Sequence, residues 1–348
     1  MRVGVLTGGG DCPGLNAVIR ALTLALLQRV PGVQVLGIER GFLGLIEGHL
    51  RALDAATVRG LVDEGGTILG THNRANPFDY QGRDASAEAM AVARREGLEA
   101  LVAIGGDGTL TLAARFAALG LPVVGVPKTI DNDIEGNERS FGFDSAVAVV
   151  ADALTRLRTT AASHRRVMVV ETMGRDAGWI ALEGGLAGGA DAILIPERPW
   201  RLEALAAHLH QRMDAQGHAL VCVAAGARLD DGDQHWQALP DGVARLGGVG
   251  QALVQALGAR WPEVEVRATV LGHLQRGGSP TAFDRVLSTR FGVAAAEAVE
   301  RGEFGHTVAL QGDRCVLVPL STVAGQNRRV PPNHELVRCA QALGALPG

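Results

Sequence analysis

The sequence predicts an α/β protein built on doubly wound, mainly parallel sheets. Short apolar runs alternate along the chain with alanine- and leucine-rich segments, and this strand–helix–strand order implies right-handed parallel crossovers. The apolar runs are continuous rather than alternating, which indicates strands buried on both faces. Length is the third observation: 348 residues exceed a single domain of ~100–200 residues, so we expect two lobes.

Each expected element follows from its local pattern. A short apolar run bounded by turn residues predicts a strand, and a longer segment rich in alanine and leucine predicts a helix. The expected strands are Val3–Leu6, Val35–Ile38, Leu101–Ile104, Val123–Val126, Val167–Val170, Ala192–Ile195, Leu220–Val223 and Ala268–Leu271. The expected helices are Ala17–Gln28, Ala85–Glu96, Thr111–Leu119, Ala146–Arg158 and Glu203–Ala215.

Composition excludes several classes of function. The net charge of −4 offers no basic surface for nucleic acid or for a membrane, and only 4% of the residues are aromatic, too few for base-stacking platforms. The cysteines Cys12, Cys222, Cys315 and Cys339 lie far apart, which argues against a disulfide framework and a zinc site. No signal peptide and no apolar run of ~18 residues is found. We expect a cytoplasmic protein without nucleic-acid or membrane partners.

The first candidate site is TGGGDCPGLN at residues 7–16, between a strand and a helix. Glycines let backbone N–H groups converge there, and the N-terminus of the following helix favours an anion. The segment matches neither the dinucleotide fingerprint nor the Walker loop. Taken alone, it is a weak signal, and a tight structural turn is the alternative.

Two further polar segments follow strands. GGDGTL at residues 105–110 adds Asp107, a hard oxygen ligand of the kind that Mg²⁺ prefers, although Asp107 can also be a helix cap. PKTIDND at residues 127–133 places a lysine, a threonine and two carboxylates after the strand Val123–Val126. Its alternative is a solvated turn with capping aspartates. The carboxyl ends of strands are where open α/β sheets bind ligands.

Cationic residues gather mostly at other strand ends, in HRR (164–166), MGRD (173–176), Arg267 and HLQRGGSP (273–280). The arginine fork suits phosphate geometry, so these residues suggest a polyanionic small molecule. His273 on its own is more typical of a structural histidine. Phosphates, a carboxylate for Mg²⁺ and a base together suggest phosphoryl transfer, with Asp131 as the base and Asp107 as the metal ligand.

The motifs GGGDCPGLN, GGDGTL, PKTIDND, MGRDAGWIAL, AGGADAILIPE and RATVLGHLQRGGSP together resemble the 6-phosphofructokinase family, in family order from Val3 to about Arg290. GGDGT alone also occurs in NAD kinases and lipid kinases. The resemblance implies two doubly wound, three-layer α/β lobes with the active site in the cleft between them. It further implies a donor lobe of residues 1–138 plus about 274–325, which binds nucleotide and Mg²⁺. Residues 139–273 and the C-terminal segment would form a sugar-phosphate lobe.

The same resemblance implies roles for individual residues in ATP-dependent phosphorylation of fructose 6-phosphate. Donor binding would involve Gly10, Arg74, Gly106, Asp107, Gly108, Thr109 and Lys128, with Mg²⁺ on Asp107. The catalytic residues would be Asp131 as general base, Thr129, Asp133 and Arg175. Sugar-phosphate binding would involve Thr129, Asp131, Arg166, Met173, Gly174, Arg175, Arg267, His273 and Arg276. Arg166 and Arg267 would reach a neighbouring subunit's site, which implies at least a homodimer, and tetramers are common in the family.

Two residues bear on the identity of the phosphoryl donor, and they favour different donors. Family members that use pyrophosphate typically have an aspartate after the metal-binding aspartate and a lysine before Thr-Ile-Asp. This chain has Gly108 and Lys128 at those places. A carboxylate beside the donor would be bulky and repulsive, and it is absent, so ATP is favoured and pyrophosphate is the alternative. A non-catalytic sugar-phosphate sensor is a third reading, against which the presence of Asp131 and Asp107 speaks.

The chain departs from the family pattern at three places. Ala225 stands where a glutamate usually bonds the sugar hydroxyls, and the loop Gly70–Asn76 is one residue longer than usual. In the pocket where many bacterial members bind effectors, Arg20 and Arg158 match the pattern. The residues Leu24, Ala55 and Ala215–His218 do not. We therefore expect weak or absent regulation by ADP and phosphoenolpyruvate.

Overall fold

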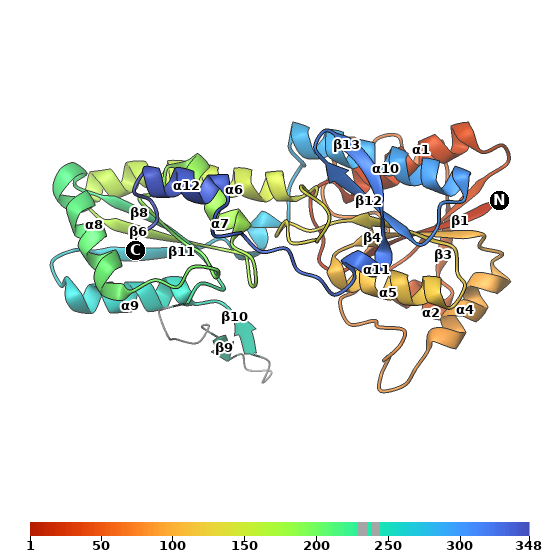
Figure 1. The fold of residues 1–348 in the computed structure, drawn as a ribbon, viewed down its shortest axis with the longest axis horizontal. Coiled ribbons are helices and arrows are strands. Elements are labelled where there is room, and N and C mark those ends of the chain that lie inside the picture. Colours follow the sequence, from red (N-terminus) through yellow and green to blue (C-terminus); the bar gives the residue numbers. More distant parts are fainter. Residues whose placement is uncertain (229–235, 239–243, 348) are drawn as a thin grey trace. The chain divides into compact units, whose positions relative to one another are not determined.

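The computed structural model describes residues 1–228, 236–238 and 244–347. The chain divides into two compact units. Unit 1 contains Met1–Ile130, Ile134–Ser145 and Arg276–Asn327. Unit 2 contains Asp131–Asp133, Ala146–Gln275 and Arg328–Gly348. Each unit has a sheet of its own, so each is described separately (Figure 1).

Unit 1 is built on a seven-stranded sheet in the order β13-β12-β5-β4-β1-β2-β3. Neighbouring strands from β12 to β2 run parallel, and an antiparallel strand closes each edge. The strands are β1 (Arg2–Gly8), β2 (Gln34–Ile38), β3 (Leu50–Leu53), β4 (Ala100–Gly105), β5 (Val123–Pro127), β12 (His306–Gln311) and β13 (Arg314–Pro319).

Helices cover both faces of this sheet. On one face α1 (Leu15–Arg29) packs along α10 (Ala282–Arg301), and Gly292 permits the close approach because a Cβ there would lie 2.7 Å from the carbonyl oxygen of Val18. The other face is covered by α2 (Phe42–Glu47), α4 (Ser86–Arg95), α5 (Asp107–Ala118) and α11 (Leu320–Val323) (Figure 1). The short helices α3 (Ala55–Val58) and η1 (Leu61–Asp63) follow β3.

Unit 2 has a four-stranded, wholly parallel sheet in the order β11-β6-β8-β7. Its strands are β6 (Val167–Thr172), β7 (Ala192–Leu194), β8 (Ala219–Ala224) and β11 (Val266–Val270). One face packs against α8 (Leu202–Gln216) and α9 (Val249–Arg260), while α6 (Phe143–His164), α7 (Trp179–Gly188) and α12 (Glu335–Ala342) cover the other. A two-stranded ribbon, β9 (Trp236–Ala238) with β10 (Ala244–Leu246), and the 3-10 turn η2 (Gly272–Gln275) complete the elements.

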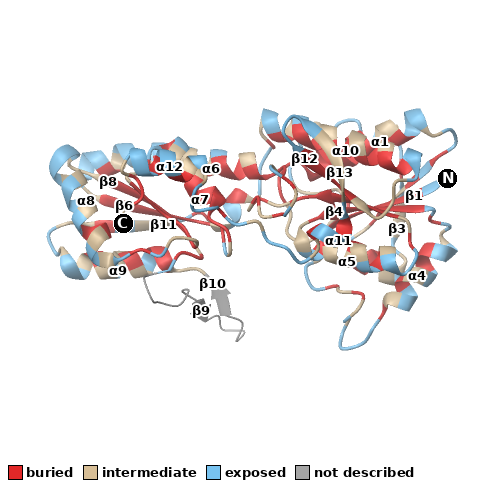
Figure 2. Cartoon of the chain, viewed as in Figure 1, coloured by how far each residue is buried: buried red, intermediate tan, exposed pale blue. Residues whose placement is uncertain are grey.

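The continuous apolar runs explain why the central strands are strands. Every residue of β4, β5, β6 and β8 is buried, as expected for strands covered on both faces, and Figure 2 shows the sheets as the buried layer of each unit. The expected α/β class with mainly parallel sheets is confirmed. Among the residues that the structure describes, no helix is both long and apolar enough to span a membrane.

Candidate active site

The carboxyl ends of three neighbouring strands bring the predicted loops of unit 1 together. β1 lies between β2 and β4, and β5 lies beyond β4, so the strand order reverses at β1. Gly8 at the end of β1 pairs with Gly105 at the end of β4, and Gly105 pairs with Pro127 at the end of β5. Such a switch point is where open α/β sheets bind ligands. The glycine loops after β1 and β4 and the segment after β5 therefore share one edge of the sheet.

The loop after β1, here called the first loop, is held by side chains from distant segments. The Thr71 hydroxyl donates to the carbonyl oxygen of Gly9 over 2.5 Å. The Arg276 guanidinium donates to the carbonyl oxygen of Asp11 over 3.2 Å. A Cβ at Gly10 would lie 2.8 Å from this guanidinium, so glycine lets the cation approach the backbone. The sequence does not predict the role of Thr71, because no local pattern indicates its contact with the first loop.

Cys12 lies in the first loop and is fully buried. Its sulfur faces the carbonyl oxygen of Phe141 at 3.8 Å, and a Cβ at Gly142 would come within 2.6 Å of the sulfur. Burial raises the pKa of the Cys12 thiol to about 12, against the opposing charge of Lys128. The thiol is therefore neutral at physiological pH, and it fills space beneath the loop rather than acting as a nucleophile.

Lys128 joins all three strand ends. Its ammonium group donates to the carbonyl oxygen of Gly10 in the first loop, and its backbone N–H donates to Gly105 over 2.9 Å. The side chain is buried, with 3% of its surface exposed. Lys128 is also the only lysine in the sequence, whereas every other long cationic side chain is arginine. A compact ammonium group suits this enclosed position.

The loop after β4 leads directly into α5. Thr109 is buried, and a Cβ at Gly8 would lie 2.5 Å from its hydroxyl oxygen, so glycines leave room for Thr109 between the two loops. Asp107 begins α5, and its Oδ1 accepts a hydrogen bond from the N–H of Gly325 over 2.7 Å. Gly108 is exposed, and a Cβ there would meet no atom within 4 Å. The space beside Asp107 is therefore open.

A Mg²⁺ ion fits this arrangement only when the donor supplies further ligands. Asp107 offers one hard carboxylate at the start of a helix, and the described part of the chain contains no group of three or more His, Cys, Asp or Glu side chains able to hold a metal. Mg²⁺ commonly binds through one or two carboxylates together with substrate phosphates and water. Asp107 suits that mode of binding, and a cage made of protein ligands alone is not present among these residues.

Arg74 lies in the loop before α4, where its side chain is exposed and its N–H donates to Nδ1 of His72 over 3.2 Å. The same loop is anchored to β1, because the Thr7 hydroxyl donates to the carbonyl oxygen of Gly70 over 2.8 Å. The structure thus brings the loop backbone to the first loop. No contact of the Arg74 guanidinium with the first loop appears among the described interactions.

Within unit 2, the segment Asp131–Asp133 makes a turn at Asn132, which is buried and has a φ of 52°. Arg328 binds this turn from the C-terminal segment. Its N–H donates to the carbonyl oxygen of Asp133 over 2.8 Å, and its Nη1 donates to that of Asn132 over 3.3 Å. Thr129, two residues before Asp131, belongs to unit 1. Arg328 is a second residue that the sequence analysis missed.

Three of the predicted site residues occupy the loop between β6 and α7. The N–H of Met173 donates to the side-chain oxygen of the buried Gln275 over 3.3 Å, and Gly174 has a φ of 123°, which favours glycine. Nε of Arg175 donates to Asp176 over 2.9 Å, and the Arg175 side chain is 66% exposed. Beside this loop the chain leaves β8, and the N–H of Ala225 donates to Thr172 over 2.9 Å.

The remaining predicted cationic residues lie in different parts of the structure. Arg166 at the start of β6 and Arg267 in β11 both form ion pairs with Glu265, whose pKa is lowered by hydrogen bonds from Arg267 and then Arg166. His273 is exposed in η2 of unit 2, whereas Arg276 belongs to unit 1 and contacts the first loop. Glu265 is a further residue without a local sequence signal.

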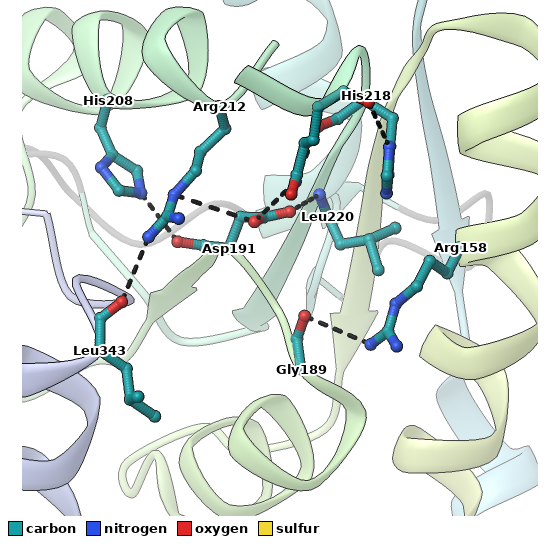
Figure 3. A network of polar contacts seen from close by, with 9 residues as sticks. Arg158, Gly189, Asp191, His208, Arg212, His218, Leu220 and Leu343 are labelled. Atoms are coloured by element: carbon teal, nitrogen blue, oxygen red, sulfur yellow. Dashed lines mark hydrogen bonds and ion pairs between the residues drawn. The ribbon is translucent and has the colours of Figure 1, made fainter. Parts of the chain in front are cut away.

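A polar network in unit 2 includes Arg158 and part of the segment Ala215–His218 (Figure 3). The other expected effector positions, Arg20, Leu24 and Ala55, belong to unit 1. The Arg158 guanidinium donates to the carbonyl oxygens of Gly188 and Gly189. Asp191 accepts from Gln216 over 3.0 Å and from the N–H of Leu220 over 2.8 Å. The network is completed by bonds of His208 to the Asp191 carbonyl, of Arg212 to the Leu343 carbonyl and of His218 to the Gln216 carbonyl. Internal polar groups thus bind one another here.

Comparison with known proteins places the chain in a family. A sequence model of the family described as "Phosphofructokinase" matches residues 2–299. An ATP-dependent 6-phosphofructokinase from Chloroflexus aggregans is 50% identical, covering 100% of this chain and 98% of that protein. A pyrophosphate–fructose 6-phosphate 1-phosphotransferase from Amycolatopsis methanolica is 47% identical, covering 95% of this chain and 97% of that protein.

Solved structures agree with these sequence matches. Phosphofructokinase from Pichia pastoris superposes with a TM-score of 0.81 at 32% identity, covering 99% of this chain, which spans 36% of that longer polypeptide. The family match and the relatives at about half identity extend over most of the sequence. This chain therefore belongs to the phosphofructokinase family.

Proposed function

We propose that this protein transfers the γ-phosphoryl group of ATP to the C1 hydroxyl of fructose 6-phosphate, releasing ADP and fructose 1,6-bisphosphate in glycolysis. The observation that carries the proposal is the meeting of the first loop, the Asp107 loop and Lys128 at one sheet edge, where backbone N–H groups and cations suit phosphates. Residues 1–138 with about 274–325 would bind the donor, and the rest of the chain would bind the sugar phosphate.

ATP is preferred over pyrophosphate on steric grounds. Gly108 leaves open space next to Asp107, where a carboxylate would repel the donor phosphates. The Chloroflexus aggregans relative is named ATP-dependent. Pyrophosphate is the second candidate donor, because Lys128 resembles the pyrophosphate-using pattern and the Amycolatopsis methanolica relative is named for that donor. The bond between Lys128 and Gly10 supports a role in shaping the first loop that either donor would require.

In the proposed reaction Asp131 removes the proton from the C1 hydroxyl as that oxygen attacks the γ-phosphorus, and the bond to the leaving oxygen of ADP breaks. Thr129 positions the acceptor, and Asp133 orients the backbone of this segment. Arg175 stabilises the charge on the transferring phosphoryl group, a role that its exposed side chain allows. The donor phosphates would contact Gly10, Gly106, Thr109 and Arg74.

Mg²⁺, when bound, would neutralise charge on the donor phosphates, and Asp107 would be its protein ligand. The bond from Gly325 fixes one carboxylate oxygen of Asp107, which orients the side chain for this task.

On the acceptor side, Met173 and Gly174 would contact the sugar, and His273 and Arg276 would bind the 6-phosphate. Arg166 and Arg267 would reach the phosphate bound by a neighbouring subunit, so the working enzyme is a cytoplasmic homo-oligomer, at least a dimer and in our proposal a tetramer. For this they must exchange part of their pairing with Glu265 for the phosphate. Ala225 supplies no sugar contact of the kind a glutamate makes.

The proposal is tested by initial rates with fructose 6-phosphate and Mg²⁺, with ATP and pyrophosphate offered in parallel. We expect turnover with ATP. Turnover with pyrophosphate alone would assign donor choice to Lys128, and no turnover with either donor would favour a non-catalytic sugar-phosphate sensor. Asp131→Ser should lower kcat by ~10²–10⁴-fold while substrate binding is largely kept, as for loss of a general base. A near-normal kcat would exclude that role for Asp131.

A further inference from the structure

Arg328 binds the backbone of the Asp131–Asp133 turn within unit 2. Asn132 holds a left-handed backbone conformation, which costs free energy in residues other than glycine, though less in asparagine than in most, and contacts around the turn offset this cost. Two of those contacts come from Arg328, through its N–H to Asp133 and its Nη1 to Asn132. The guanidinium is charged at every physiological pH, so its bond to a carbonyl is a charge-assisted one.

Arg328 is itself held in place by Trp179. Its guanidinium lies over the Trp179 ring, 4.3 Å from the centroid, and the Trp179 Nε1–H donates to the carbonyl oxygen of Arg328 over 3.3 Å. Trp179 is 1% exposed, and His334 packs edge-on against it at 4.9 Å. A cation over a buried tryptophan is stabilised by the ring, so both side chains have a defined position.

The chain on either side of this pair is also fixed. Glu197 accepts from the N–H of Val330 over 2.9 Å, two residues after Arg328. The same carboxylate accepts from the N–H of Gly178 over 3.0 Å, immediately before Trp179. Residues 328–330 are therefore connected to the start of α7 twice, through Trp179 and through Glu197. The helix α7 follows the loop that carries Arg175.

We propose that Arg328 is a positioning residue for the reaction. Its guanidinium stacks on Trp179, and the residue donates hydrogen bonds to the carbonyl groups of Asn132 and Asp133. These bonds fix the backbone that presents Asp131. The inference rests on the proposed function for its catalytic consequence, but the local ordering of the turn does not depend on it. Arg328 need not touch either substrate for this role. Its effect on catalysis acts through the backbone of residues 131–133, which Arg328 holds in position.

Three variants of the full-length protein test the proposal. Arg328→Met removes the charge and the Nη1 bond but keeps the length of the side chain, and Arg328→Lys keeps the charge without the planar fork. Arg329→Met is the matched control, because Arg329 is the adjacent arginine and is exposed. The first readout is amide hydrogen exchange of the ligand-free protein in peptides that cover residues 129–134, which needs no activity.

We expect Arg328→Met to speed exchange in that segment by about tenfold, with exchange in β6 and β8 unchanged, and Arg328→Lys to give a smaller rise. With substrates, kcat should fall by about 10- to 100-fold while KM for ATP changes by less than about threefold, because a misplaced base affects the transition state rather than donor binding. A fourth variant, Arg328→Ala, leaves room for guanidinium ion, which should restore part of the kcat of this variant and leave the kcat of Arg329→Met unchanged.

Unchanged exchange in residues 129–134, or equal losses in Arg328→Met and Arg329→Met, would overturn the proposal. Faster exchange in a protein whose wild type turns over neither donor would refute the proposed function and leave the structural role of Arg328 standing. If Arg328→Met does not fold, Arg328→Lys decides by the same exchange measurement. A selective rise at 129–134 supports the proposal, and its absence overturns it.

Discussion

The ammonium group of Lys128, at the end of β5, is bonded to the carbonyl oxygen of Gly10 in the loop after β1. The contact joins two strand ends that β4 separates in the sheet. A buried ammonium needs acceptors, and this carbonyl is one of them. Lys128 is therefore part of the architecture of the first loop as well as a candidate donor ligand.

The first prediction concerns this contact. Lys128→Met should lower the free energy of unfolding by ~1–3 kcal/mol, because the Gly10 carbonyl loses a charged donor in a buried place. The value of kcat/KM should fall with ATP and with pyrophosphate alike, since the first loop would serve either donor. Denaturant unfolding and parallel initial rates measure both effects.

Lys128→Arg is the control for charge alone, and it should fail to rescue the enzyme because the site is enclosed. Since Lys128 is the only lysine, amine acetylation of the native protein should modify the N-terminus and spare residue 128 until the protein is unfolded. Rapid acetylation of native Lys128, or a Lys128→Met variant of unchanged stability, would contradict the prediction.

A second prediction tests the open space at Gly108. Gly108→Asp should fold normally, because a Cβ at this position meets no atom within 4 Å and an aspartate near the start of α5 suits the helix dipole. With ATP, kcat/KM should drop by at least about tenfold, since the new carboxylate would repel the donor phosphates. Initial rates with both donors measure the change.

Gly108→Ala is the matched control for that experiment. It should keep ATP turnover and raise the stability by ~0.5–1 kcal/mol, as expected for alanine replacing glycine at an unstrained helical position. Full ATP activity in Gly108→Asp would show that residue 108 does not face the donor, and the steric argument for ATP would then be wrong.

The sequence predicts the central strands of both sheets well, but it does not predict three strands of unit 1. Each expected strand begins and ends within two residues of the observed one. The central strands are predictable because burial on both faces requires continuous apolar runs. The strands of unit 1 that the sequence does not predict are β3, β12 and β13, of which β3 and β13 lie at the edges of the sheet. β13 (Arg314–Pro319) contains the apolar run Cys315–Val318, yet it is exposed at its ends and only half-buried between them. Edge position is a tertiary fact that local pattern does not encode.

The candidate site shows the same division. Loops that directly follow strands could be predicted, because the carboxyl ends of parallel strands meet at one edge. The contacts of Thr71 with Gly9, of Gly325 with Asp107 and of Arg328 with Asn132 span 62, 218 and 196 residues along the chain. The sequence assigns no role to Arg328, yet this residue binds the Asp131–Asp133 turn. Such contacts form only in the completed fold, and no local spacing of residues in the sequence predicts them.

A third prediction concerns the region shown in Figure 3. Phosphoenolpyruvate should not bind with low-micromolar affinity, because the Arg158 guanidinium is already bonded to the carbonyl oxygens of Gly188 and Gly189. An anion would have to replace those bonds, and the segment Ala215–His218 brings no lysine to help. Titration calorimetry of the native protein measures the affinity, and low-micromolar binding would contradict the prediction.

The last prediction is a pH dependence that arises from Asp284 near the start of α10. Its Oδ2 accepts from the N–H of Ser145 over 2.8 Å and from the Ser145 hydroxyl over 2.6 Å. Burial raises the pKa of Asp284 from 3.8 to about 6, more than these hydrogen bonds lower it, and the charge of Asp144 adds to the rise. The folded protein thus binds a proton here that the unfolded chain has released.

Because the folded pKa is raised, the stabilisation from this proton is fully present below pH 3.8 and is lost as the pH rises through about 6. Asp284→Asn is neutral at every pH and should lack this loss. Relative to that variant, the free energy of unfolding of the wild type should fall by about 2 kcal/mol between pH 4.5 and pH 7.5. Denaturant unfolding of both proteins across this range measures the difference. Asp313→Asn, at an exposed position, should run parallel to the wild type. If the free energy of unfolding of Asp284→Asn also runs parallel to that of the wild type, Asp284 stays ionised in the folded protein, and the hydrogen bonds from Ser145 stabilise its charge.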